Sequence, residues 1–87
     1  MLILFAKKFK KKYWKLQIGL QRQCDERLHL FESEPFHDLL YNHALNAPYS
    51  GCRSINVTGD YRAIFYYESE FTVRFIDVDT HHNLFGT

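Results

Sequence analysis

Residues that can bind phosphate and move protons are concentrated in the second half of the chain. Across the first predicted hairpin, Val57 is expected to face Tyr61. Alternation then places Asn56 and Arg62 on one face of the sheet, and Arg74 on the next strand has the same parity. Guanidinium and amide groups hydrogen-bond phosphate oxygens, so this face is predicted to bind an anion. The alternative is an ordinary solvated sheet face.

Three further residues could move protons beside that face. His81 follows the last predicted strand, so its imidazole can reach over the sheet from the edge. His43 lies in the loop that leads into the sheet, where proton transfer and loop hydrogen bonding are both open. Asp60 lies in a hairpin turn, where aspartate also serves turn geometry. Because imidazole titrates near neutral pH, histidine suits general acid and base catalysis.

Arg53 and Phe85 are further candidates for contact with a substrate. Arg53 has core-side parity, so phosphate binding there requires an irregular strand entry or a bulge. Phe85 could stack on a base or cap the core. His82 would point away from His81 on an extended backbone and is therefore left out of the predicted site.

The cysteine and histidine spacings match no standard metal-binding motif. Cys24 and Cys52 are far apart in the chain, with no CxxC pattern. The remaining possible ligands are His37, Asp38, His43, His81 and His82. We therefore expect no metal, no cofactor and reduced cysteines.

Charged residues are distributed unevenly along the chain, although its formal net charge is only +1. Residues 1–23 carry six lysines and one arginine with no acidic residue, a formal charge of +7. Residues 24–87 carry four arginines and ten acidic residues, a formal charge of −6. A basic N-terminal segment predicts a polyanionic partner, with Lys8, Lys11 and Lys12 as phosphate contacts. The alternative is a solvated helix face that keeps a small protein soluble.

Hydrophobic periodicity predicts the elements that position these residues. Residues 1–5 are apolar and predict a short first strand. Apolar residues recur at helical spacing from Lys7, with lysines between them that are expected to face outward. A second helical pattern runs from Leu20 to Phe31, and Pro35 ends it.

Three antiparallel strands are predicted after residue 50, because the pattern there alternates and two turn signals divide it. The second hairpin is expected to pair Tyr67 with Phe71. One face should pack against the helices. The predicted core residues on that face are Ile55, Val57, Tyr61, Ala63, Phe65, Phe71, Val73 and Phe75. The expected fold is a single α+β domain over residues 1–87, in the order β-α-α-β-β-β, with a small antiparallel sheet.

Composition and length favour one folded domain away from the membrane. With 87 residues, of which 46% are hydrophobic, the chain has enough apolar material for a core and is not expected to be disordered. The apolar run from Met1 to Ala6 is too short to span a bilayer, and lysines follow it instead of preceding it. We expect a cytoplasmic location.

Several segments, taken in order, resemble the RelE/YafQ family of toxins, and YafQ-like members most closely. The residues that carry the resemblance are His43-Ala44-Leu45, the run GCRSINVTGDYRAIF over residues 51–65, and THHNLFG over residues 80–86. The basic first helix and the Glu34-Pro35-Phe36 helix stop also match. The resemblance covers nearly the whole chain, and it is specific because the segments occur together and in order.

The resemblance implies a toxin that cuts messenger RNA without a metal, on the ribosome or free, and that an antitoxin partner inhibits. The positions that match functional residues of YafQ-like toxins are His43, Asp60, His81 and Phe85. Arg62 matches a strand arginine shared with other RelE relatives. The sequence departs from the pattern at Asn56, where YafQ-like toxins have a histidine. An amide cannot exchange a proton near neutral pH, so the division of acid and base roles stays open.

Metal-free RNA cleavage requires removal of a 2′-hydroxyl proton, stabilisation of charge at the phosphorus and protonation of the leaving 5′-oxygen. Arg62 suits the second role. His81 is predicted to protonate the leaving oxygen, while His43 or Asp60 takes the 2′-proton. Products would then carry a 2′,3′-cyclic phosphate and a 5′-hydroxyl.

Two other functions remain possible at this stage. A toxin of the same fold, like the ParE branch, acts by binding gyrase without catalysis. The presence of His43, Asp60 and His81 argues against that reading. A module that binds RNA without cutting it is the other alternative.

Overall fold

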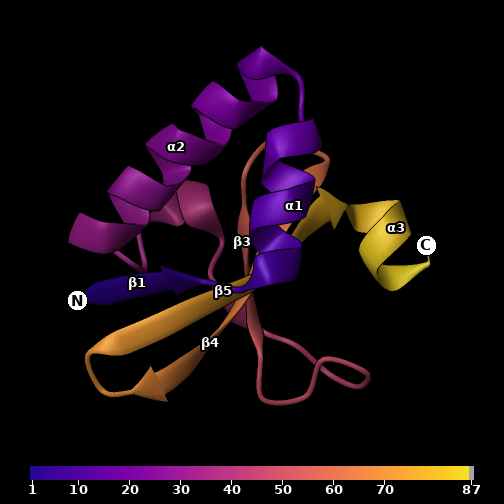
Figure 1. Ribbon diagram of the computed structural model, residues 1–87. Helices are drawn as coiled ribbons and strands as arrows, with labels where there is room; N and C mark the ends of the chain where they lie inside the picture. The colour runs from indigo at the N-terminus through magenta and orange to yellow at the C-terminus, as the bar shows by residue number, and fades with distance from the viewer. Residues whose placement is uncertain (87) are drawn as a thin grey trace.

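A computed structural model describes residues 1–86 and shows a five-stranded mixed sheet, with α1 and α2 over one of its faces (Figure 1). The strand order is β1-β5-β4-β3-β2. The elements are β1 (Leu2–Phe5), α1 (Lys7–Lys15), α2 (Ile18–Ser33), the 3-10 helix η1 (Asp38–Leu40), β2 (His43–Ala44), β3 (Arg53–Asn56), β4 (Tyr61–Ser69), β5 (Thr72–Thr80) and α3 (His81–Phe85). The predicted α+β order is confirmed, and η1, β2 and α3 are additional to it.

The predicted meander is antiparallel, but the sheet as a whole is mixed, because β1 joins it in parallel. β1 pairs with β5 in parallel, with Ile3 opposite Val73. Alternation and turn residues predict only the pairing of strands that a short turn connects. The partner of β1 is decided instead by where α1 and α2 place the chain before the meander begins. No local pattern in the sequence carries that information.

The first hairpin has the predicted register, and its apolar face forms the core. Ile55 lies opposite Ala63, and Asn56 lies opposite Arg62. Phe31 of α2 packs edge-on against Phe65, with ring centroids 4.9 Å apart. The buried core cluster consists of Phe9, Cys24, Phe31, Leu40, Ile55, Val57, Ala63, Phe65, Val73, Phe75 and Val78. Side-chain alternation therefore predicted correctly which sheet face is buried.

The second hairpin differs from its predicted register by two residues. Tyr67 lies opposite Val73 instead of Phe71. The turn contains only two residues, and Phe71 is one of them, with 69% of its surface exposed. A shift of two residues preserves side-chain parity, so Val73 and Phe75 are buried as predicted. Phe71 was wrongly placed in the core.

Two lysines of α1 form ion pairs with β5. Lys8 Nζ lies 3.0 Å from Asp77, and Lys12 Nζ lies 2.7 Å from Asp77 and 3.0 Å from Asp79. The prediction that the lysines of α1 face solvent is therefore wrong for Lys12, whose side chain is 32% exposed, whereas Lys8 is 64% exposed and still faces solvent. Burial alone lowers the pKa of Lys12, but its hydrogen bonds to both carboxylates outweigh burial and raise it. The Asp77 side chain is only 4% exposed, and a buried carboxylate is costly unless it is paired.

The ion pairs predict that the protein loses stability in acid. Burial alone raises the pKa of Asp79, but hydrogen bonds from Asn83, the Thr80 amide and Lys12 outweigh burial and lower it. A carboxyl group with a lower pKa in the folded state stabilises the fold above its unfolded pKa, and this contribution disappears as the pH falls through the folded pKa. The free energy of unfolding should therefore decrease between about pH 5 and about pH 3. Urea denaturation across this range measures the decrease.

Asp79→Asn provides the control for this prediction, because an amide does not titrate in that range. The variant should be less stable than the parent at neutral pH, and its stability should change less between about pH 5 and about pH 3. An identical pH dependence in the two proteins would show that other carboxyl groups are responsible.

The two cysteines are free thiols. Cys24 is completely buried, and burial, followed by the nearby Asp25 charge, raises the pKa of its thiol to about 12. Cys52 is partly buried, which raises the pKa of its thiol as well. Over residues 1–86, no helix is both long enough and apolar enough to cross a membrane.

Candidate active site

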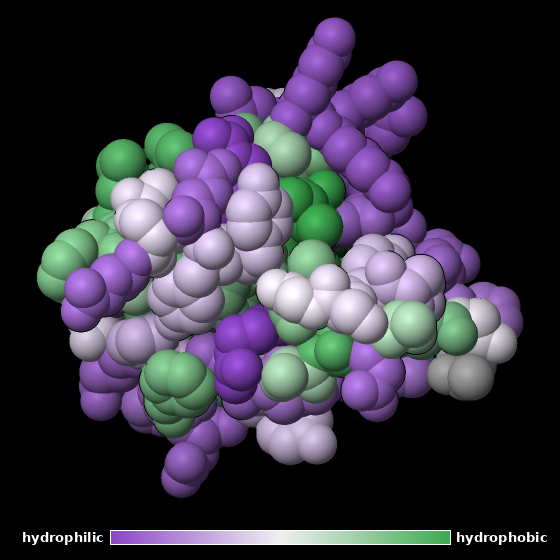
Figure 2. Space-filling model, turned by 90° about the horizontal axis from the view of Figure 1, so that it is seen from below, coloured by the Kyte–Doolittle hydropathy of each residue, from purple (hydrophilic) through white to green (hydrophobic). Residues whose placement is uncertain are grey.

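A hollow of about 280 Å³ lies on the sheet face opposite the main core. Side chains from the η1–β2 segment, β3, β4 and α3 form its walls. The lining residues are Tyr41, His43, Leu45, Ser54, Arg62, His81 and Phe85. The structure thus brings together four of the predicted site residues from distant parts of the sequence. Figure 2 shows the molecule from below, where hydrophilic and hydrophobic residues are interleaved on the surface.

His43 is held in a defined tautomer. β2 places it opposite Ser54 of β3, and its Nδ1 lies 2.8 Å from the backbone carbonyl oxygen of Tyr41. A carbonyl oxygen can only accept a hydrogen bond, so Nδ1 must carry the proton. The Nε2 atom of His43 is then the nitrogen that can accept a proton, as a general base must.

Tyr41 contributes to this arrangement and was not predicted from the sequence. It ends η1 with a positive φ of 46°, and its ring packs against that of His43 with centroids 4.5 Å apart. Non-glycine residues seldom adopt this left-handed conformation, and those that do are frequent at functional sites. No spacing or motif in the sequence marks Tyr41, because its conformation depends on the packing of η1.

His81 begins α3, where the sequence had suggested extended backbone. Thr80 caps the helix, since its Oγ1 accepts a hydrogen bond from the Asn83 amide at 3.1 Å. The His81 amide donates to the Asp60 carbonyl oxygen at 2.8 Å, which joins α3 to the turn before β4. The His81 and Phe85 rings pack with centroids 4.8 Å apart. The short helix α3 therefore places the His81 and Phe85 side chains in the lining of the hollow. His82 is exposed and does not line the hollow.

Arg62 projects from β4 into the hollow and also supports the preceding turn. Its Nη1 donates to the carbonyl oxygens of Thr58 and Gly59 at 3.0 Å and of Tyr61 at 3.2 Å. Its Nε and Nη2 make no hydrogen bond within residues 1–86. These two nitrogens can therefore bind an anion while Nη1 anchors the side chain.

Asp60 lies beside the hollow but is not one of its lining residues. Its side chain is exposed, and its amide donates to Thr58 Oγ1 at 3.2 Å, a typical turn interaction. Its backbone carbonyl holds His81. The geometry thus assigns Asp60 a clear structural contribution, and its predicted catalytic role stays a prediction.

Two buried polar atoms on this sheet face have no hydrogen-bond partner among the residues described. They are Ser54 Oγ and Asn56 Oδ1. Buried polar groups are nearly always paired in folded proteins, so both atoms can accept a contact from water or from a ligand. Ser54 lines the hollow and was missing from the predicted site, although alternation had placed it on the correct face. Asn56 lies opposite Arg62 but outside the lining.

The other predicted contact residues lie away from the hollow. Arg74 forms an ion pair with Glu68. Arg53 donates from Nε to Asn42 Oδ1 at 2.7 Å, and its guanidinium lies 5.5 Å from the centre of the Phe36 ring. Lys8 and Lys12 pair with aspartates of β5. Lys11 is exposed and forms no ion pair within the described part of the chain. The structure therefore leaves Lys11 as the predicted lysine most accessible to phosphate.

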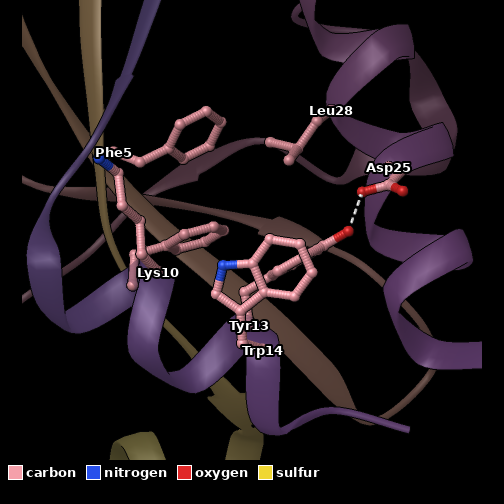
Figure 3. Close-up of a pocket in the computed structure, with 7 residues that line it drawn as sticks. Phe5, Lys10, Tyr13, Trp14, Asp25 and Leu28 are labelled. Carbon is pink, nitrogen blue, oxygen red and sulfur yellow. Dashed lines mark hydrogen bonds between the residues drawn. The ribbon is translucent and has the colours of Figure 1, made fainter. Parts of the chain in front are cut away.

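A second hollow, of about 330 Å³, lies between α1 and α2 (Figure 3). Its lining is mostly apolar and consists of Phe5, Phe9, Lys10, Tyr13, Trp14, Asp25 and Leu28. The Tyr13 hydroxyl donates to Asp25 at 2.7 Å (Figure 3), and this hydrogen bond is the main reason that the pKa of Tyr13 rises to about 12. The one carboxylate of this second hollow is thus hydrogen-bonded to Tyr13 and its lining holds no histidine, which makes the hollow beside His43 and His81 the better candidate for proton transfer.

Possible metal ligands are scattered in the structure. Nowhere in residues 1–86 do three or more His, Cys, Asp or Glu side chains cluster in a way that could hold a metal ion. The candidate site is therefore described by its histidines and its arginine alone.

Comparison with known proteins gives matches only at the level of structure. No family model matches the chain, and neither does any curated protein. The structure of YafQ from E. coli is similar, with a TM-score of 0.81 and 22% identity, covering 97% of both chains. The E. coli DinJ-YafQ toxin-antitoxin complex gives a TM-score of 0.79 and 22% identity, covering 97% of this chain and 96% of that one.

A third similar structure is the YoeB/ParE toxin from Agrobacterium tumefaciens. Its TM-score is 0.76 at 15% identity, and the match covers 93% of this chain and 99% of that one. The likeness therefore extends over nearly the full length of each of these proteins. The chain has the α+β fold of the RelE/YafQ toxins.

Proposed function

We propose that this chain is the toxin of a toxin-antitoxin pair and that it acts as a metal-independent endoribonuclease on messenger RNA. The observation that carries the proposal is the hollow in which His43, Arg62, His81 and Phe85 meet. Two imidazoles can act as general base and general acid, and a guanidinium can stabilise the charge on the phosphate, which are the three functions that metal-free phosphodiester cleavage requires. The RelE/YafQ toxin fold supports the same conclusion.

Each residue has one role in the proposed reaction. His43 takes the proton from the 2′-hydroxyl, because its Nε2 is the unprotonated nitrogen. Arg62 stabilises the charge on the attacked phosphate through Nε and Nη2. His81 protonates the leaving 5′-oxygen, and Phe85 stacks on a base beside it. Asp60 is the alternative general base, and its exposed place outside the lining favours His43.

Further contacts would hold the substrate. Ser54 lines the hollow and Asn56 lies opposite Arg62, so a small side-chain rearrangement would bring their unpaired oxygens to the substrate, and exposed Lys11 contributes positive charge from α1. Lysine contacts to phosphate add affinity without selecting a sequence. We propose that the messenger RNA is presented on the ribosome, in the cytoplasm.

The proposed partner is a cognate antitoxin. Similar structures were solved as the DinJ-YafQ complex of E. coli and the YoeB-YefM complex from Staphylococcus aureus. Large apolar side chains on the surface, such as Trp14 at 72% exposure, are suited to burial by another protein. The antitoxin is expected to be encoded beside the toxin.

The test is to incubate the purified protein with messenger RNA, with and without translating ribosomes, and to map the RNA ends. We expect cleavage to leave a 2′,3′-cyclic phosphate and a 5′-hydroxyl. The EDTA test of metal independence, in which cleavage should persist, applies to free RNA, because translating ribosomes themselves require Mg²⁺. His82→Gln is the matched control, because this exposed neighbour of His81 lies outside the hollow. Binding to RNA without cleavage under either condition would favour an RNA-binding module. Inhibition of gyrase without cleavage would favour a ParE-like toxin.

A further inference from the structure

We propose that Asp79 is a positioning residue, whose Oδ1 oxygen holds α3 in the orientation that presents His81 and Phe85 to the hollow. The inference rests on the function proposed for that hollow. Asp79 itself is not among the residues that line it. Its effect on catalysis must therefore pass through α3.

The helix α3 needs contacts from outside itself. It contains five residues, far fewer than an isolated helix needs to be stable in water. Thr80 caps its start, and Gly86 ends it in the left-handed conformation. These local contacts define the helical turn, but they do not determine how the turn is oriented on the sheet. The orientation depends on the packing of buried Leu84 and on hydrogen bonds between α3 and neighbouring elements, which fix the rotation that packing alone leaves open.

Asp79 supplies a side-chain hydrogen bond of this kind. Its Oδ1 accepts from Asn83 Nδ2 at 2.8 Å and from the Thr80 amide at 2.7 Å. Asn83 lies in the middle of α3, two residues from both His81 and Phe85. The Asp79 contact therefore acts at the centre of the helix. Together with the His81 amide bond to the Asp60 carbonyl oxygen, it attaches α3 at two points.

The two carboxylate oxygens of Asp79 serve different elements. Oδ1 makes both contacts to the α3 region, whereas Oδ2 accepts from Lys12 Nζ of α1 at 3.0 Å. Asp77 shares the same lysine at 2.7 Å, but within residues 1–86 its carboxylate contacts only α1 and the adjacent Val78 amide. Asp77 and Asp79 thus form a natural pair for comparison, because both bind α1 and only Asp79 binds α3.

This division allows variants that separate positioning from stability. In Asp79→Ala both contacts to α3 are lost. In Asp79→Asn the amide oxygen can occupy the place of Oδ1 and keep both, while the ion pair with Lys12 is lost. Asp77→Asn loses ion pairs with α1 without affecting α3. If Asp79→Ala does not fold, Asn83→Ala removes the same contact from the helix side.

We expect Asp79→Ala to slow single-turnover RNA cleavage by on the order of 10- to 10²-fold, the size of effect that a small displacement of a catalytic group produces. Substrate binding should weaken through the displaced Phe85 ring, but by less than the rate falls, because His43 and Arg62 belong to other elements and keep their positions. Asp79→Asn should recover most of the parent rate. Asp77→Asn should melt at a lower temperature and cleave at the parent rate. Equal losses of rate in Asp79→Asn and Asp79→Ala would overturn the proposal.

A second measurement does not depend on activity. The His81 ring protons lie next to the Phe85 ring, with centroids 4.8 Å apart, so their NMR shifts report the geometry of α3. Asp79→Ala should change these shifts and speed amide exchange at Asn83, whereas Asp79→Asn and Asp77→Asn should not. Unchanged shifts in Asp79→Ala would refute the positioning role. If the parent protein cut no RNA, the proposed function would fail, while these shifts would still decide whether Asp79 orients α3.

Discussion

Replacing His81 with Gln should reduce the single-turnover cleavage rate by about 10²-fold or more, with little change in substrate binding. Glutamine keeps similar size and hydrogen bonding but cannot supply a proton near neutral pH. The backbone bond from residue 81 to the Asp60 carbonyl oxygen does not depend on the side chain. The loss should therefore report proton transfer to the leaving 5′-oxygen.

An activated substrate distinguishes this role from a general loss of geometry. A 5′-thiolate leaving group needs no proton, so it should restore much of the rate that His81→Gln loses. His82→Gln, one residue further along α3, should behave as the parent protein. If the activated substrate gives no gain, or if His81→Gln cuts at the parent rate, His81 is not the general acid.

Arg62→Ala should reduce cleavage by about 10²- to 10³-fold, the typical cost of removing one donor that stabilises transition-state charge. Growth arrest on expression should disappear with it. The Nη1 contacts to the carbonyl oxygens of the turn add a second effect, because the two N–H groups of Nη1 are shared among these oxygens and a hydrogen bond contributes about 1 kcal/mol to stability. We therefore expect a lower free energy of unfolding as well as lost activity, with a circular dichroism spectrum that still shows a folded protein.

Arg62→Lys separates the two contributions of this residue. Lysine keeps a positive charge, but its ammonium group lacks the planar guanidinium that lets arginine bind the turn with one nitrogen and a phosphate with the other two. We expect binding to RNA close to that of the parent and a cleavage rate still well below it. If Arg62→Lys cuts RNA at the parent rate, a positive charge at this position is sufficient for catalysis without the guanidinium geometry. Failure of Arg62→Ala to fold would make Arg62 primarily a structural residue.

The sequence by itself determined which sheet face is buried and which carries Arg62. Strand side chains alternate with a period of two, so parity is encoded by neighbouring residues alone. This is why Val73 and Phe75 were correctly placed in the core although the register of the second hairpin was wrong by two residues. The two helices were also predictable from local sequence, because their apolar spacing and the proline that ends the second helix involve only neighbouring residues.

Only the tertiary structure decided how the candidate site is assembled. The tautomer of His43 depends on the Tyr41 carbonyl, and the place of His81 depends on the turn at Asp60. The lysines of α1 looked equivalent in the sequence, but Lys8 and Lys12 face aspartates of β5 because β1 pairs in parallel with that strand and delivers α1 beside it. The His81 and lysine contacts join residues that are far apart in the chain, and the His43 contact, although local, depends on the left-handed conformation that packing gives Tyr41. Their energies arise only when packing brings the partners together, so no local pattern can encode them.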